Sequence, residues 1–394
     1  MKKSMKKLAA IVMTATMLTL LAASPAIASA ASPVNLRIDG VVSSPDVAAF
    51  TENGRTLVPM RMIAETLGAE VAWSDSNRQA TFTTAMYTVV FTIGSDRFTV
   101  NGETKSLDVP AQVVNGRTMV PMRAFAEAIG ADVNYDATSN TATVDYFTRM
   151  TGSLKLSGST TVQPIAQGAA DYLITQNPGL SITVAGGGSG AGRNDALAGT
   201  VNIGMISSAL SAQHIADGLL AHTIANDGIA LIVHPSNPVS NLTAEQAMQI
   251  FAGEIRNWNE VGGNNAPIIL HTRETGSGTL DALSSLLMAG NAVAERATPH
   301  ASSTLIKQAV AREANAIGFD SIGFVDSTVK KVTLDNREAN TANVLDKTYL
   351  LGRELYVCTK GEVTDPLTAK FIDFLRSVFC QQNIVESEGY IQLG

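Results

Sequence analysis

Two short segments of this chain combine residue types that bind anions, residues 157–161 (Ser-Gly-Ser-Thr-Thr) and residues 273–279 (Arg-Glu-Thr-Gly-Ser-Gly-Thr). Each places small residues and hydroxyls directly before a segment predicted to be helical, and the second adds a guanidinium. A helix N-terminus exposes unpaired N–H groups and carries about half a positive charge, so such ends bind anions. Because the two segments lie more than a hundred residues apart, we expect two lobes that close on one oxyanion.

A glycine-rich run at residues 186–192 also precedes a predicted helix, at residues 194–198. It does not fit the G-x-G-x-x-G pattern and no G-K-[ST] follows, so nucleotide binding is not supported. Each segment also has a simpler interpretation. Residues 157–161 could be an ordinary Ser/Thr helix cap, and residues 186–192 could be a flexible turn. In residues 273–279, Arg273 could pair with Glu274 on the surface. Three donor-rich helix starts in one domain favour anion binding over these alternatives.

The N-terminus has the pattern of a secretory signal peptide. Four lysines precede an apolar run from about residue 8 to residue 23, and small residues follow, ending in Ala28-Ser29-Ala30. We predict a cleavable signal peptide at residues 1–30, with a retained N-terminal anchor as the alternative. No Cys follows the apolar run, so the usual lipid-anchor signal is missing. The expected location is secreted or at the extracellular cell surface.

The net charge and the cysteine content exclude several classes of function. The formal charge of −7 becomes about −11 once the four leader lysines are removed, which argues against nucleic-acid or anionic-membrane partners. No His or Cys cluster has the spacing of a metal site, so we predict neither a metal nor a cofactor. Cys358 and Cys380 are the only cysteines, and a disulfide and two buried free thiols both stay open.

The first part of the chain contains an internal repeat. Residues 53–71 and 115–133 are identical at 13 of 19 positions. In each copy an Asn-Gly turn precedes a short predicted helix, which Pro59 or Pro121 opens and Gly68 or Gly130 ends. With the alternating strand patterns around these helices, the repeat predicts a small α+β domain at residues 31–148.

These repeat motifs resemble the copper amine oxidase N-terminal-like stalk domain of secreted bacterial proteins. No His or Cys occurs before residue 214, so the segment has no obvious copper site. We expect the four repeat arginines to bond turn carbonyls and carboxylates rather than a ligand: Arg55, Arg61, Arg117 and Arg123. The resemblance implies a spacer or a cell-surface attachment module, with cell-wall components as candidate partners.

Residues 152–394 alternate apolar strands with amphipathic helices, which is typical of α/β lobes built on a mainly parallel sheet. Residues 225–234 form a long apolar segment that could cross between lobes. Residues 349–359 could return, and residues 367–379 could form a closing helix. We place lobe I at about residues 152–228 and 350–394, and lobe II at about residues 229–349.

This second domain resembles the phosphate-binding proteins of bacterial phosphate ABC importers, which have a two-lobed type II periplasmic-binding-protein fold. The resemblance spans the domain and depends on a combination of motifs that are weak singly. They are residues 157–164, the glycine-rich loop around Ser189, and residues 225–230, 237–243, 250–258, 273–279 and 388–390.

The resemblance implies a set of phosphate ligands and a function. The ligands from the first lobe would be Ser159, Thr160, Thr161, Ser189 and Ser207, and those from the second would be Arg273, Ser277, Gly278 and Thr279. The protein would capture inorganic phosphate between its lobes and deliver it to the membrane permease of an ABC importer.

Selectivity between phosphate and sulfate is left open by the sequence. Some family members place an Asp where Ser207 stands, and that Asp accepts the proton of hydrogen phosphate. A serine both donates and accepts, so it does not enforce the discrimination. Asp195 and Asp227 are the alternatives.

Two other functions are alternatives to phosphate transport. A surface-attached protein could bind an oxyanion for sensing or adhesion without transport. A Ser-dependent phosphatase or esterase could use Ser159 or Ser277, but a serine nucleophile needs a base in reach. His271 is the nearest histidine in sequence to Ser277, and it lies in the predicted strand before the loop. We therefore predict that the protein is not an enzyme.

Overall fold

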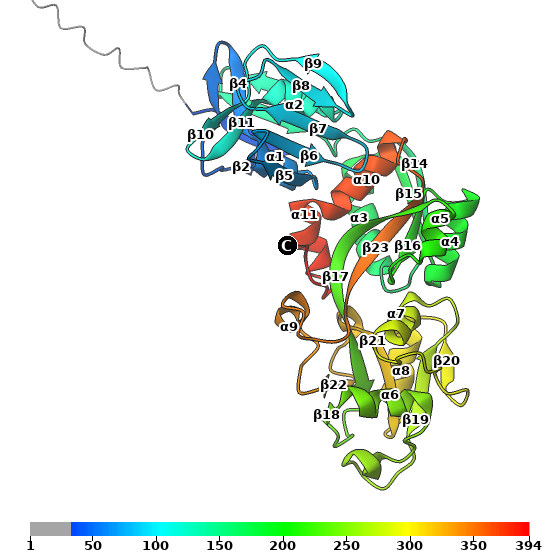
Figure 1. Cartoon of the computed structure of the whole chain (residues 1–394). Coiled ribbons are helices and arrows are strands. Elements are labelled where there is room, and N and C mark those ends of the chain that lie inside the picture. The colour runs from blue at the N-terminus through cyan, green and yellow to red at the C-terminus, as the bar shows by residue number, and fades with distance from the viewer. Residues whose placement is uncertain (1–32, 394) are drawn as a thin grey trace, which may run out of the picture.

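The computed structural model describes residues 33–393, and the expected signal peptide at residues 1–30 lies outside them. Figure 1 shows three parts in a row. We call residues 33–149 the repeat domain, residues 150–228 with 352–393 lobe I, and residues 229–351 lobe II. Within the described range, no helix is both long and apolar enough to span a bilayer.

The two sequence repeats fold into the same unit of a hairpin and a short helix. The first consists of β3 (Phe50–Glu52), β4 (Arg55–Pro59) and α1 (Met60–Thr66), and the second of β10 (Gln112–Val114), β11 (Arg117–Pro121) and α2 (Met122–Ala128). β4 pairs antiparallel with β11, so that one sheet, in the order β10-β11-β4-β3, joins the copies. Pro59 and Pro121 are the N-caps of the two helices, which confirms the predicted helix starts.

Two further sheets complete the repeat domain. The first is a meander of β5 (Glu70–Ser74), β6 (Gln79–Thr83), β7 (Thr88–Thr92), β8 (Arg97–Val100) and β9 (Glu103–Ser106). The second has the order β12 (Asp132–Asp136), β13 (Thr141–Asp145), β1 (Asn35–Ile38) and β2 (Val41–Ser43). Buried and less buried residues alternate along β6 and β13, as expected for strands with one face on a core.

The four repeat arginines bind carboxylates, as expected. Arg55 Nε donates to Asp108 Oδ2 at 2.6 Å, and Arg117 Nε donates to Asp46 Oδ2 at 2.8 Å. Arg61 and Arg123 each pair with the glutamate one helical turn later. All of these pairs are exposed, so solvent and salt screen them and each contributes little to stability.

Lobe I is built on parallel strands with helices beside them. β14 (Gly152–Gly158) lies between β15 (Leu180–Gly187) and β16 (Ile203–Ile206), and pairs parallel with both. The helices that follow these strands are α3 (Gln163–Gln176), α4 (Gly188–Ala198) and α5 (Ala212–Ala216). Lobe I also contains the last elements of the chain, α10 (Pro366–Arg376), α11 (Val378–Cys380) and a π-helical turn at Gln381–Val385.

Lobe II repeats the βα arrangement. β19 (Ile269–Arg273) pairs parallel with β20 (Thr298–His300) and β21 (Ala316–Ser321), and β18 (Asn241–Leu242) pairs with β22 (Lys330–Leu334). The helices are α6 (Ala244–Ala252), α7 (Gly278–Leu286), α8 (Ser303–Arg312) and α9 (Thr341–Leu345), with short 3-10 turns at Trp258–Val261 and Ile322–Phe324. A separate hydrophobic core fills this lobe.

Two long strands connect the lobes. β17 (Leu219–Val233) pairs with β23 (Gly352–Lys360) as far as Gly228, and with β21 from Ile229 onward. β17 therefore crosses from lobe I to lobe II, and β23 lies beside its first part (Figure 1). β17 starts six residues before the segment predicted to cross, because Leu219 to Thr223 add antiparallel pairs with β23.

The repeat domain and lobe I share one hydrophobic core. α10 carries the contact: Asp373 is fully buried and accepts hydrogen bonds from Ala85 N and from the Tyr146 hydroxyl, both at 2.7 Å. The Phe147 and Phe374 rings meet edge to face, with centroids 5.2 Å apart. Burial raises the pKa of Asp373 to about 7. Cys358 and Cys380, whose pairing the sequence left open, are both buried and free.

Candidate functional site

Four helices begin where the two lobes face each other, and each brings a buried hydroxyl. Thr161 lies just before α3, and Ser189 lies in the first turn of α4. Across the junction, Thr279 lies in the first turn of α7, and Ser303 begins α8. Because unpaired N–H groups and the helix dipoles make each of these ends positive, their convergence favours a negative ligand.

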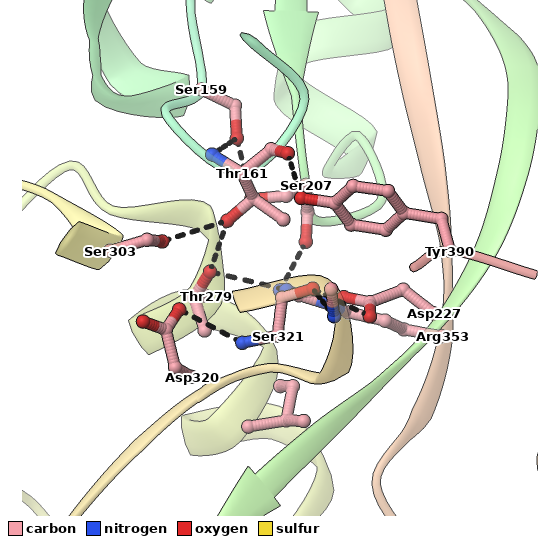
Figure 2. Close-up of polar contacts among 12 residues, drawn as sticks. Ser159, Thr161, Ser207, Asp227, Thr279, Ser303, Asp320, Ser321, Arg353 and Tyr390 are labelled. Carbon is pink, nitrogen blue, oxygen red and sulfur yellow. Dashed lines mark hydrogen bonds and ion pairs between the residues drawn. The ribbon is translucent and has the colours of Figure 1, made fainter. Parts of the chain in front are cut away.

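Hydrogen bonds tie these hydroxyls across the two lobes (Figure 2). The Thr161 hydroxyl oxygen lies 3.0 Å from that of Thr279 and 3.4 Å from that of Ser303. Within lobe I, the Ser207 hydroxyl oxygen lies 3.0 Å from that of Ser159 and 3.4 Å from that of Ser189. The side chains of lobe I and lobe II are therefore in direct contact, and the lobes are closed on each other.

Arg273 supplies the charge of this cluster and is only 3 % exposed. Its guanidinium donates to Ser303 Oγ at 3.1 Å and across the junction to Thr160 Oγ1 at 3.0 Å. Its other hydrogen-bond acceptors are backbone carbonyls of residues 300 and 301, and none of its bonds within residues 33–393 goes to a carboxylate. Burial lowers the pKa of Arg273. A buried guanidinium without a direct acid partner is suited to an anionic ligand.

The first residue of α7 and the turn before it lie directly against lobe I. A Cβ added at Gly278 would lie 2.2 Å from Ser189 Oγ and 2.7 Å from Ser207 Oγ. Gly190 N donates to Gly276 O at 2.8 Å, again across the junction. Only a residue without a side chain fits at position 278 when the lobes are closed.

The structure places all nine residues named from the sequence at this junction, eight of them buried and Thr160 half-buried. Ser277 differs from the others, because its hydroxyl accepts from Leu280 N at 3.4 Å and caps its own helix. One prediction about their setting was wrong: α4 begins inside the glycine-rich run, at Gly188, and not after it.

The junction also contains residues that were missed from the sequence, among them Ser303, Arg353 and Tyr390. Ser303 had a usable signal, since Ser302 and Ser303 precede a helix just as residues 159–161 do. Tyr390 donates to Thr161 O at 2.6 Å. Tyr390 belongs to the motif at residues 388–390, which contributed to the family resemblance but did not indicate this contact.

Arg353 lies in β23 and connects three segments. It donates to Asp227 Oδ2 from Nε at 2.9 Å and from Nη2 at 2.8 Å, and to Ser207 O at 2.8 Å. Its Nη2 also lies 3.2 Å from Thr279 Oγ1 in lobe II. Arg353 thus holds the crossing strands and both lobes at one point, and no local pattern in the sequence indicates this role.

Both carboxylates considered for anion selectivity already have partners. Asp195 accepts from Ser157 Oγ at 2.6 Å. Asp227 binds Arg353 through one oxygen and accepts from Ser321 Oγ at 2.7 Å through the other. Because both carboxylates already accept hydrogen bonds from protein side chains, neither is positioned to accept the proton of a bound ligand.

Comparisons with known proteins agree with this architecture. Residues 130–378 match the PBP superfamily domain, and residues 37–144 match the copper amine oxidase N-terminal domain. The phosphate-binding protein PstS of Bacillus subtilis is 33% identical over 248 residues, which cover 62% of this chain and 81% of that protein. The chain therefore belongs to the periplasmic-binding-protein superfamily and, within it, to the PstS family, as the motifs predicted.

Solved structures show the same relationship. A putative phosphate ABC transporter substrate-binding protein from Clostridium perfringens, with bound phosphate, is 38% identical, with a TM-score of 0.60. It matches over its whole length and over 62% of this chain. An ABC-type phosphate transport receptor from Vibrio cholerae is 35% identical, with a TM-score of 0.54, and matches over its whole length and 61% of this chain. The fold class is thus the two-lobed fold that was predicted.

Proposed function

We propose that this protein captures inorganic phosphate between lobes I and II. The observation that supports this most is the buried cluster of hydroxyls at four helix starts around Arg273, which has no carboxylate partner among the described residues. The proposed ligands are the nine residues already named, with Ser303 added. The naming of the relatives for phosphate agrees with the chemistry of this cluster.

The energetics of this site are sufficient. A micromolar affinity needs about −8 kcal/mol, and each hydrogen bond to a charged group contributes roughly 1.5–3 kcal/mol. Several such bonds exceed the cost of association, which is at least about 4 kcal/mol. Closure excludes water and strengthens each remaining contact.

Capture requires the lobes to open, because hydroxyls that would bind phosphate now bond each other. The hinge in this proposal is the pair of crossing strands, β17 and β23. The ligand would replace the bond between Thr161 and Thr279 with bonds to its own oxygens, so that one anion joins both lobes. A dianion also supplies the countercharge for Arg273.

Delivery to the permease of a phosphate ABC importer is part of the proposal, as is export of the chain to the cell surface. We propose residues 31–148 as a spacer or attachment module and residues 152–394 as the binding domain. Binding without transport, for sensing or adhesion, is the alternative. Permease-dependent phosphate uptake into membrane vesicles, with and without this protein, separates the two.

We propose binding and not catalysis. Within residues 33–393, no histidine forms a hydrogen bond with Ser159 or Ser277, the two candidate nucleophiles. His271 Nδ1 instead lies 3.0 Å from His300 Nε2. A serine without a base in reach is a poor nucleophile.

The direct test is calorimetric titration of the mature protein with phosphate, arsenate, sulfate and molybdate. We expect saturable binding of phosphate with one ligand per chain. No heat of binding for any of the four oxyanions would overturn the proposal. Phosphate release from a model ester that is lost in Ser277→Ala would instead favour the enzyme.

A further inference from the structure

One buried carboxylate at the junction, that of Asp320, has an oxygen without a hydrogen-bond partner among residues 33–393. Asp320 is the penultimate residue of β21 and is fully buried. Its Oδ1 accepts from the backbone N of Ser321 at 2.9 Å. Its Oδ2 is also buried, yet it has no hydrogen-bond partner among residues 33–393. A buried acceptor left without a donor is costly, so its presence calls for a physical reason.

Asp320 lies among the groups proposed to bind phosphate. Figure 2 shows its side chain below Ser303 and beside Thr279, on the lobe II side of the cluster. The Ser303 hydroxyl and the charges of Arg273 and Arg353 lower the pKa of Asp320, but burial has the larger effect and raises it to about 6. At neutral pH the group is therefore mostly a carboxylate, and it lies near the Ser303 hydroxyl and the charges of Arg273 and Arg353.

A lone acceptor among donors distinguishes oxyanions by their protons. Hydrogen phosphate and hydrogen arsenate carry an O–H at neutral pH, whereas sulfate carries none. A carboxylate accepts a hydrogen bond from a protonated ligand oxygen and repels an oxygen that has no proton. The hydroxyls of Ser207, Thr279 and Ser303 adapt to either ligand, because each can donate or accept.

We propose that Asp320 is the residue that selects phosphate over sulfate in this chain, by accepting the proton of bound hydrogen phosphate on Oδ2. This inference rests on the proposed phosphate site. It places the discriminating carboxylate in lobe II, at the end of β21, and not at Ser207 in lobe I. Asp195 and Asp227 are excluded from this role by the partners that they already have.

The test compares Asp320→Asn with wild type by calorimetric titration with phosphate, arsenate and sulfate at pH 7.5. The amide keeps the size of the side chain but offers N–H donors. We expect the preference for phosphate over sulfate to fall by about tenfold or more, because one charge-assisted hydrogen bond is lost and a repulsion is removed. Asp326→Asn, an exposed site in the same lobe, is the matched control and should keep the wild-type preference.

Each outcome decides between the two proposals. Wild-type protein that binds no phosphate overturns the proposed function itself. Phosphate binding with an unchanged preference in Asp320→Asn overturns only the role of Asp320. An equal gain in affinity for phosphate and sulfate also overturns it, since Asp320 would then be only a countercharge for Arg273. Asp320→Ser, with a smaller neutral side chain, repeats the test with the same expected change, so that a folding defect peculiar to Asp320→Asn does not decide the result.

Discussion

Arg273 shows how a single residue determines the preference of the site for an anion. Its guanidinium is held by hydroxyls and carbonyls, which satisfy its N–H groups, and none of its hydrogen bonds among the described residues goes to a carboxylate. Burying such a charge is unfavourable unless an anion joins it. The arginine therefore favours an occupied, closed site over an empty, closed one.

Replacing this arginine should therefore reduce phosphate affinity. We expect Arg273→Ala to weaken phosphate binding at least about tenfold, because one or more charge-assisted hydrogen bonds to the ligand are lost. Calorimetric titration measures the change. Arg312→Ala, at the exposed end of α8, is the control for a general loss of positive charge. Equal affinities in Arg273→Ala and wild type would remove this residue from the site.

Gly278 allows lobe closure to be tested, because adding one methyl group at this position should prevent the lobes from closing. In Gly278→Ala the added Cβ would overlap Ser189 Oγ in the closed state, and opening the lobes relieves the overlap. We expect phosphate binding to fall sharply while the melting temperature without ligand changes little. Small-angle scattering should then show no compaction when phosphate is added. A variant that binds and compacts like wild type would contradict the closed geometry.

Among the secondary-structure elements, those with local signals could be predicted from the sequence. Pro59 and Pro121 predicted α1 and α2, and the hydroxyls of residues 159–161 predicted the start of α3. The start of α4 could not be predicted, because glycine disfavours a helix and tertiary contacts, mainly with β14 and β16, stabilise this one. Arg353 was missed for a related reason, since its partners come from distant parts of the chain.

β23 holds the junction together through Arg353. Arg353→Ala would leave the fully buried carboxylate of Asp227 without its cation, and breaking such a pair costs about 3–5 kcal/mol. We expect a lower midpoint in urea unfolding, together with weaker phosphate binding. The double variant Asp227→Asn with Arg353→Met should recover much of the stability, because no buried charge is left over. A double variant as unstable as Arg353→Ala would contradict this account of the pair.

At the scale of the whole molecule, the two sequence repeats differ in their surroundings. A Cβ at Gly68 would lie 1.9 Å from the carbonyl oxygen of Asp373 in lobe I, whereas a Cβ at Gly130 would meet nothing within 4 Å. Both glycines have positive φ, 81° and 73°, so an alanine is strained in the backbone at either position. They therefore form a matched pair in which only one member touches lobe I.

This pair measures how strongly the repeat domain is joined to lobe I. We expect Gly130→Ala to lower the melting temperature only modestly, through backbone strain. Gly68→Ala should lower it further and separate one calorimetric transition into two, because the backbones of the two parts can no longer approach. The same melting curve for both variants would mean that the contact at Asp373 contributes little.

The same junction should respond to pH. The pKa of Asp373 is about 7 in the folded state and near 3.8 in an unfolded chain, so the folded state holds the proton more tightly. The contribution of Asp373 to stability is therefore full below about pH 4 and is lost as the pH rises toward 7. Tyr146, Lys370 and Arg376 are the other ionisable groups around it.

The pH effect is measured against Asp373→Asn, which does not titrate. We expect the unfolding free energy of wild type minus that of Asp373→Asn to be larger at pH 5 than at pH 8. Three histidines whose pKa values are lowered by burial, one buried and two half-buried, act in the opposite direction, but they are present in both proteins. A difference that is constant between the two pH values would show that Asp373 does not titrate in this range.

The two ends of the described chain differ in how close they lie to the hinge. Val34 and the strands that follow it belong to the core that the repeat domain shares with lobe I, whereas Ile391 pairs with Asn226 in β17 and packs in the core of lobe II. A tether attached to the repeat domain therefore does not pull on the crossing strands, but one attached after Ile391 does. Protein immobilised on a sensor surface through its repeat domain should capture its ligand as freely as protein in solution.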